Sequence, residues 1–182
     1  MANIAIIGGT GQLGKGIARR LAQGGHQVTL GSRTADKAKA VADEMAALGL
    51  TLGSGANEDV ATGKDVVIVT VPHASQGDTL RQIAPLVGNA VVVDTTVPLV
   101  PPKVMRVQLP AEGSAAMQAR GHLGANVRLV TAFHNVAAHI LDSDHKVECD
   151  VLAFSDDVEA RNIVVSLIAD MGLRGLSGGA LP

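Results

Sequence analysis

Aromatic residues are nearly absent from this chain, which contains no Trp, no Tyr and two Phe in 182 residues. Proteins that bind single-stranded nucleic acids usually stack the bases on aromatic rings, so this mode of binding is not expected here. The net charge is -2 and no basic stripe runs along the sequence, which also argues against a nucleic-acid partner. A flat ring bound by this protein would lie mainly against aliphatic side chains and backbone.

Cysteine and long apolar segments are scarce as well. Cys149 is the single cysteine, so no disulfide can form within the chain, and a reducing cytoplasm is the expected location. No segment has the pattern of a signal peptide or the length of a membrane span, so no membrane association is expected. Asp142, Asp144 and His145 are typical of a solvated turn, and no metal site is expected.

Glycine, in contrast, is abundant, with 21 residues, and it follows a clear pattern near the N-terminus. The apolar run at residues 4–7 has the length of one buried strand, and it stops at Gly8. A helical pattern of apolar residues comes next, and a second β-rich run covers residues 27–30. This order of strand, glycine turn, helix and strand predicts the first βαβ unit of a dinucleotide-binding domain.

Three glycines of this unit, Gly9, Gly11 and Gly14, match the spacing G-x-G-x-x-G. The first permits a tight turn, the second lets the backbone approach a pyrophosphate, and the third lets the helix pack closely on the strand. The free N–H groups at the start of the helix would then face the phosphates. The same segment matches the start of a P-loop, but Gly16 stands where that motif needs Ser or Thr, which argues against a kinase.

The end of the second predicted strand indicates which dinucleotide binds. NAD-binding domains usually place Asp or Glu there, but this chain has Ser32 and Arg33, followed one helical turn later by Lys37. A hydroxyl, a guanidinium and an ammonium group suit the 2′-phosphate of NADP, so the sequence predicts NADP(H) as the cofactor. The alternative is that Arg33 and Lys37 are ordinary solvated surface charges.

Strand and helix patterns alternate through the rest of the chain. We expect strands at residues 50–52, 65–71, 90–93, 128–133, 151–155 and 173–176, and helices at residues 34–48, 57–61, 75–88, 112–120 and 156–171, with a turn and a short helix over residues 134–141. Thr34 and Asn57 are expected to cap helices, and residues 94–110 are irregular and rich in proline, including Pro101 and Pro102. The pattern predicts a single α/β domain over residues 1–182, of the Rossmann type, with a doubly wound, mainly parallel sheet.

Ligands of doubly wound sheets bind beyond the carboxyl ends of the strands, and three predicted loops meet this rule, at residues 71–73, 95–98 and 133–136. Pro72 and Pro98 would hold rigid apolar walls beside a nicotinamide ring. His134 could form a hydrogen bond or exchange a proton with a bound ring, or it could be a structural histidine bonded to backbone.

Several longer motifs extend over nearly the whole chain. They are GGTGQLGKG and GSR near the start, then DVVIVTVP, VVVDTTVPL and EGSAA, and finally VTAFHNVAAHIL and FSDDVEARNIVVSLIADMGLRGLSGGAL. Together they resemble the NADPH-dependent reductases of the deazaflavin coenzyme F420, the 8-hydroxy-5-deazaflavin:NADP oxidoreductases.

The resemblance implies hydride transfer, in either direction, between NADPH and coenzyme F420 as a small-molecule co-substrate. Because such a transfer requires mainly positioning of two rings, no acid or base residue is expected to be indispensable. The resemblance also implies the following contacts: for the pyrophosphate, Thr10, Gly11, Gln12 and Leu13; for the 2′-phosphate, Ser32, Arg33 and Lys37; for the nicotinamide side, Val71, Val97, Pro98 and Ala138; for the deazaflavin, His134 and Asn135.

Two alternatives stay open at this point. The protein could reduce another acceptor with NADPH, such as a flavin, a ferric chelate or an imine, because similar domains serve several acceptors. It could also be a non-catalytic module that binds NADPH. Members of the family are expected to continue past GGAL into a C-terminal helical stretch that pairs subunits. A homodimer is therefore expected, although this stretch is expected to be missing from a chain that ends at Pro182.

Overall fold

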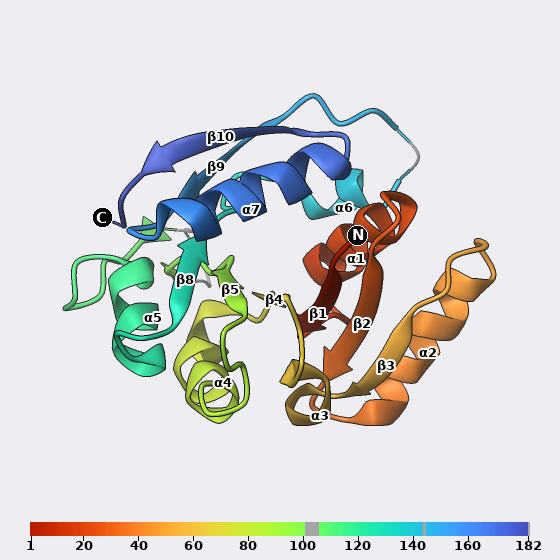
Figure 1. The fold of residues 1–182 in the computed structure, drawn as a ribbon, viewed down its shortest axis with the longest axis horizontal. Helices are drawn as coiled ribbons and strands as arrows, with labels where there is room; N and C mark the ends of the chain where they lie inside the picture. The colour runs from red at the N-terminus through yellow and green to blue at the C-terminus, as the bar shows by residue number, and fades with distance from the viewer. Residues whose placement is uncertain (101–105, 144, 182) are drawn as a thin grey trace.

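The fold is described by a computed structural model for residues 1–100, 106–143 and 145–181. Within these residues, eight strands form one sheet in the order β10-β9-β8-β5-β4-β1-β2-β3 (Figure 1). Taken along the sheet, the strands are β10 (Arg174–Gly179), β9 (Asp150–Phe154), β8 (Arg128–Thr131), β5 (Val91–Asp94), β4 (Val66–Val69), β1 (Asn3–Ile7), β2 (Gln27–Ser32) and β3 (Gly53–Ala56).

The strand directions confirm the predicted fold class. Every pair of neighbours from β3 to β8 is parallel, and the chain turns from one side of the sheet to the other between β1 and β4. This is the strand order of a doubly wound Rossmann sheet. At the far edge, β9 runs antiparallel to β8 through the pair Thr131 and Phe154, and β10 runs parallel to β9.

Helices cover both faces of the sheet (Figure 1). They are α1 (Gln12–Gln23), α2 (Ala35–Ala46), α3 (Asn57–Ala61), α4 (Gln76–Ile83), α5 (Ala115–Leu123), α6 (Ala138–Leu141) and α7 (Val158–Asp170), with a 3-10 turn η1 (His73–Ser75) before α4. On β1, Ile4 and Ile6 pack with α1, α2 and α7, whereas Ala5 and Ile7 pack with α3, α4 and α5. The alternation of side chains along buried parallel strands therefore builds two apolar cores, one on each face.

The third strand lies later in the chain than predicted. The apolar residues 50–52 were expected to form it, but β3 is Gly53–Ala56, the segment that was expected to end it. A Cβ at Gly53 would lie 3.0 Å from Thr29 Oγ1, and a Cβ at Gly55 would lie 2.9 Å from Val60 Cγ1. The prediction was wrong because these glycines are required by close packing beside β2 and α3, and not by a turn.

One of the two predicted helix caps lies where it was expected. Thr34 is the N-cap residue of α2, as predicted, although its side chain forms no capping hydrogen bond. Asn57 is the first residue of α3, and Ala56 occupies the N-cap position. Asp157, in contrast, accepts a hydrogen bond from the N–H of Ala160 at 2.9 Å and so caps α7.

The proline-rich connection after β5 contains a short antiparallel hairpin. Its strands are β6 (Leu99–Val100) and β7 (Arg106–Val107), with Leu99 opposite Val107. Pro101 and Pro102 lie outside the described residues.

Within the described chain, no helix is long and apolar enough to cross a membrane.

Candidate functional site

A cavity of about 540 Å³ lies where the carboxyl ends of β1, β2 and β4 meet, beside the point at which the crossovers change direction. We refer to it as the glycine-loop cavity. Doubly wound sheets bind nucleotides at this position. Its lining residues are Gly8, Thr10, Gly11, Ser32, Arg33, Thr34, Lys37, Asn57, Thr70, Val71, Pro72, Ser75 and Thr79.

The loop between β1 and α1 leaves the start of α1 open toward this cavity. Gly8 has a φ of 73°, which favours glycine, and the N–H of Gly9 donates to Gly31 O at 2.9 Å, which ties the loop to β2. The first turn of α1 carries no acidic residue, and its N-cap Gly11 offers no side chain as a hydrogen-bond acceptor. The N–H groups and the positive end of the helix dipole are therefore available to an anion.

Gly14 lies on the first turn of α1 against the loop itself. A Cβ at this position would lie 2.7 Å from Gly9 Cα and 2.7 Å from Thr70 Oγ1. Real Cβ atoms do not approach other atoms so closely, so a larger residue would force α1 away from the loop and from the end of β4. The role predicted for this glycine, close packing of the helix, agrees with these distances.

Asn57 also lines the cavity, a position that the sequence did not predict. Its side chain is buried, and its Oδ1 accepts a hydrogen bond from the N–H of Gly8 at 3.2 Å. Asn57 thus fixes the glycine loop from the start of α3. A single Asn at the start of a short helix is typical of a cap, so no local pattern indicated this longer contact.

Two exposed cations line the wall of this cavity, one directly after β2 and one in the first turn of α2. Arg33 and Lys37 form no ion pair with any described residue, whereas Lys15 pairs with Glu44 at 2.6 Å and Lys39 pairs with Asp43 at 2.7 Å. The described wall contains no Asp or Glu, and Ser32 beside Arg33 is buried. Two unpaired cations and a hydroxyl group therefore face a cavity without a competing carboxylate, which suits a phosphate group.

A second cavity of about 310 Å³ lies beyond the carboxyl ends of β5 and β8. We refer to it as the β5–β8 cavity. Most of the apolar part of its wall is aliphatic, with Phe154 as an aromatic member, so a flat organic ring could lie mainly against aliphatic side chains. The lining residues are Thr96, Val97, Pro98, Val107, Leu109, Ser114, Ala115, Ala116, Thr131, His134 and Phe154.

His134 brings a hydrogen-bonding group to this apolar wall. The residue before it, Phe133, is buried and has a φ of 68°, a left-handed conformation that is uncommon for residues other than glycine. Such backbone strain is found most often at functional sites. Desolvation lowers the pKa of the His134 imidazole below its ordinary value, so the ring is neutral at pH 7 and can donate one hydrogen bond and accept another.

A buried network of hydrogen bonds supports the wall of the β5–β8 cavity. Gln76 Nε2 donates to Asp94 Oδ2 at 2.7 Å and to Thr96 Oγ1 at 2.6 Å, and Thr96 Oγ1 donates to the same carboxylate oxygen at 2.9 Å. Burial raises the pKa of Asp94 to about 6, although these hydrogen bonds act in the opposite direction. Because Thr96 lines the β5–β8 cavity, the network positions the loop that continues to Val97 and Pro98.

Comparison with known proteins decides the family. Residues 3–98 match the model of the family described as NADP oxidoreductase coenzyme F420-dependent. Two curated relatives named F420-dependent NADP reductase match over 98% of this chain. The relative from Methanothermobacter thermautotrophicus is 35% identical, with 81% of its length covered, and the relative from Methanocaldococcus jannaschii is 34% identical, with 84% covered. The chain belongs to the coenzyme F420-dependent NADP oxidoreductase family. The resemblance predicted from the sequence motifs is thereby confirmed.

Solved structures extend the likeness at the level of the fold. A hypothetical protein from Sinorhizobium meliloti superimposes with a TM-score of 0.82 at 22% identity, over 99% of this chain and 86% of that one. A pyrroline-5-carboxylate reductase from Coxiella burnetii gives a TM-score of 0.70 at 17% identity, over 97% of this chain and 59% of that one. The F420-dependent NADP oxidoreductase family thus shares this Rossmann-type arrangement with reductases of other names.

Most of the residues that were predicted for the F420-dependent NADP oxidoreductase site line one or the other of the two cavities. Thr10, Gly11, Ser32, Arg33, Lys37 and Val71 line the glycine-loop cavity, whereas Val97, Pro98 and His134 line the β5–β8 cavity. Gln12 and Leu13 form the first turn of α1, and the buried Gly9 bonds to β2. Thr70, Ser75 and Thr79 were not predicted, because single hydroxyl residues after a strand or near the start of a helix carry no distinctive pattern.

Five predicted residues line neither cavity. Three of them, Gly9, Gln12 and Leu13, belong to the glycine loop and the start of α1, and the other two are Ala138 and Asn135. Ala138 begins α6, and the side chain of Asn135 donates to Asp150 O at 2.9 Å at the start of β9. Asn135 lines a different, open cavity of about 980 Å³ with residues 146–150, 169 and 172–175, and this cavity shares no lining residue with the β5–β8 cavity. In the part of the chain that the structure describes, no group of three or more His, Cys, Asp or Glu residues could hold a metal ion.

Proposed function

We propose that this protein transfers a hydride between NADPH and coenzyme F420. The observation that carries the proposal is the similarity, over 98% of the chain, to proteins named F420-dependent NADP reductase. When bound, NADPH supplies a hydride with its electron pair, and the deazaflavin accepts it and takes up a proton from solvent, which completes a two-electron reduction. Binding, orientation and exclusion of water are then the tasks of the protein.

The glycine-loop cavity is the proposed NADP site. Its residues fit the cofactor, because the open start of α1 suits the pyrophosphate and two unpaired cations suit the 2′-phosphate. We assign the pyrophosphate to the first turn of α1 and its preceding loop, and the 2′-phosphate to Ser32, Arg33 and Lys37. The nearby wall of Val71 and Pro72 provides an apolar surface for the nicotinamide half.

The β5–β8 cavity is the proposed site of the deazaflavin. Its mainly aliphatic wall fits a flat ring system. Val97 and Pro98 in this wall were predicted for the nicotinamide side, so they would lie where the two rings meet. The neutral imidazole of His134 can donate one hydrogen bond to a ring carbonyl and so orient the ring. Asn135 and Ala138 stay proposed contacts, and both would have to be reached from the edge of this cavity.

The deciding experiment compares acceptors. Protein and NADPH are mixed with coenzyme F420 and, separately, with FMN, and the absorbance of each acceptor is followed. We expect rapid bleaching of the deazaflavin and slow or no bleaching of FMN. Bleaching of FMN without bleaching of the deazaflavin would overturn the proposal in favour of another acceptor, and no turnover with any acceptor would favour a binding module.

We also propose that two copies of the chain pair and that they act in the cytoplasm. Leu152 on β9 and Leu176 on the edge strand β10 are register partners, and both are exposed, at 43% and 39%. Pairing of subunits would remove such side chains from water. The single free cysteine, Cys149, supports a reducing compartment. Sedimentation velocity is expected to give the mass of two chains, and a monomer at every concentration would contradict the pairing.

A further inference from the structure

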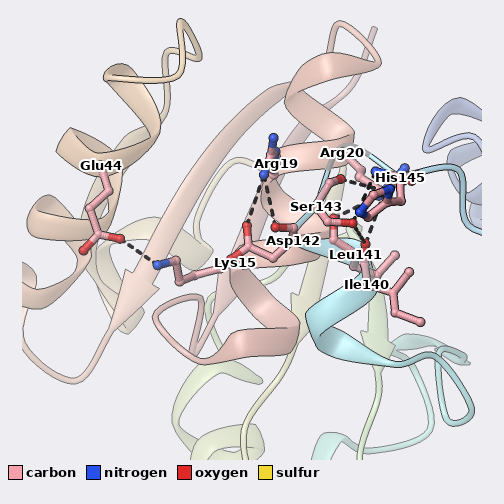
Figure 2. A network of polar contacts seen from close by, with 9 residues as sticks. All are labelled: Lys15, Arg19, Arg20, Glu44, Ile140, Leu141, Asp142, Ser143 and His145. Atoms are coloured by element: carbon pink, nitrogen blue, oxygen red, sulfur yellow. Dashed lines mark hydrogen bonds and ion pairs between the residues drawn. The ribbon is translucent and has the colours of Figure 1, made fainter.

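One arginine of α1 holds the end of α6 and the residues after it. We refer to residues 134–143 and 145 as the α6 segment. Figure 2 shows the Arg20 guanidinium directed into this segment, more than a hundred residues away in the chain. Arg20 donates to four backbone carbonyls there: from Nε to Leu141 (2.9 Å), and from Nη2 to His145 (2.8 Å), Ser143 (2.9 Å) and Ile140 (3.4 Å).

The α6 segment needs such support. Helix α6 is four residues long, about one turn, and an isolated helix of this length is not stable in water. The last carbonyls of any helix lack partners within it, and a cation at this end also interacts favourably with the helix dipole. Arg20 supplies both the donors and the positive charge. A planar guanidinium can serve several acceptors at once, which an ammonium group cannot do with the same geometry.

Two further residues on the same face of α1 touch the segment. Arg19 is buried, and its Nη1 donates to Asp142 O at 3.1 Å and lies 3.8 Å from Asp142 Oδ1 (Figure 2). A Cβ at Gly16 would lie 2.6 Å from Leu141 Cβ, so the two helices are in direct backbone contact there. Positions 16, 19 and 20 are spaced as i, i+3 and i+4, which places them on one side of a helix.

This contact links the two cavities through one rigid helix. The N-cap residue of α1, Gly11, lines the glycine-loop cavity, and the later turns of the helix hold the α6 segment. The first residue of that segment, His134, lies in the wall of the β5–β8 cavity. We propose that Arg20, together with Arg19, is a positioning residue that sets the place of the acceptor relative to the nucleotide. The inference rests on the proposed function, because it assigns the two rings to these two cavities.

The variant Arg20→Ala tests the inference. The kcat for reduction of coenzyme F420 by NADPH is expected to fall about 10- to 100-fold, the loss that a misplacement of about 1 Å can cause. The Kd for NADPH is expected to stay within about twofold of wild type, because the glycine-loop cavity does not depend on the α6 segment. Arg20→Lys keeps the positive charge but loses the planar guanidinium with its several donors, so its kcat should lie between those of Arg20→Ala and the wild type.

Chemical rescue separates positioning from a loss of folded protein. Guanidinium chloride at low millimolar concentration should restore part of the kcat of Arg20→Ala, because the free ion can donate to the same carbonyls. Lys39→Ala is the control, since it removes a cation of α2 that pairs with Asp43 and lines neither cavity. Its kcat is expected to stay within about twofold of wild type.

Three outcomes would overturn the inference. They are an unchanged kcat in Arg20→Ala, a loss of NADPH affinity as large as the loss of kcat, and an absence of rescue by the guanidinium ion. If the wild-type protein does not reduce coenzyme F420, both the proposed function and the inference on Arg20 are wrong. If the wild type does reduce it, the inference alone is tested by the ratio of kcat in Arg20→Ala to kcat in the wild type.

Discussion

NADPH is expected to bind Arg33→Ala about 10- to 150-fold more weakly than the wild-type protein, whereas NADH is expected to bind both alike. The loss corresponds to about 1.5–3 kcal/mol, the contribution of hydrogen bonds to a charged group. Arg33 lines the glycine-loop cavity and has no ion-pair partner among the described residues, so its guanidinium is available to the 2′-phosphate that distinguishes the two nucleotides. Quenching of NADPH and NADH fluorescence, titrated at one salt concentration, measures both constants.

Lys39→Ala is the matched control for this measurement. Lys39 lies on α2 like Lys37, but it pairs with Asp43 and does not line the described cavity wall. Removing it should change the affinity for either nucleotide by no more than about twofold, because exposed pairs of this kind contribute little. Equal losses of NADPH and NADH affinity in Arg33→Ala would show that this arginine does not select the phosphate.

Asp94→Asn is expected to stabilise the protein at pH 7.5 by up to about 3 kcal/mol. The pKa of Asp94 is raised to about 6, against an ordinary value of 3.8, so the folded state binds the proton more tightly than the unfolded state. The stability that the protonated carboxyl contributes is present below pH 4 and is lost as the pH rises through 6. Each pKa unit corresponds to about 1.4 kcal/mol, which sets the size of the expected gain. Asparagine keeps an oxygen acceptor for Gln76 and Thr96 and removes the buried charge.

Urea unfolding at pH 4.5 and pH 7.5 measures this difference between variant and wild type. The advantage of Asp94→Asn should be large at pH 7.5 and much smaller at pH 4.5. Asp43→Asn serves as the control, because this exposed carboxylate is paired on the surface of α2 and its loss should cost less than about 1 kcal/mol. An Asp94→Asn protein that is less stable than wild type at pH 7.5 would mean that the ionised carboxylate is well accommodated by its network.

The nucleotide side of the site could be predicted from the sequence because its signals are local. The strand, the glycine turn and the helix follow one another within a few residues, and Gly8 and Gly14 are required there by a positive φ and a close approach, respectively. Arg33 directly follows β2 and Lys37 lies in the first turn of α2, and position alone indicates their role. The parallel sheet could be predicted for the same reason, since buried strands alternate with helices along the chain.

Features that depend on distant partners could not be predicted. β3 is defined by pairing with β2, and its glycines indicate a turn when they are read alone. Strand β9 runs antiparallel, although its apolar run is like that of a parallel strand. Arg19 and Arg20 are ordinary basic residues in the helical pattern, and their partners lie more than 120 residues later. Asn135 bonds to the start of β9, a contact that the motif around it does not encode.

Transfer of deuterium tests the proposed reaction most directly. The protein is given NADPH that carries two deuterium atoms at C4 of the nicotinamide, with coenzyme F420 in ordinary water, and the reduced deazaflavin is analysed by mass spectrometry. Direct hydride transfer between two bound rings predicts one deuterium on carbon in every molecule of reduced deazaflavin, because water is excluded from the transfer. Reduced deazaflavin without deuterium, or no reduction at all, would contradict hydride transfer between NADPH and coenzyme F420 by this protein.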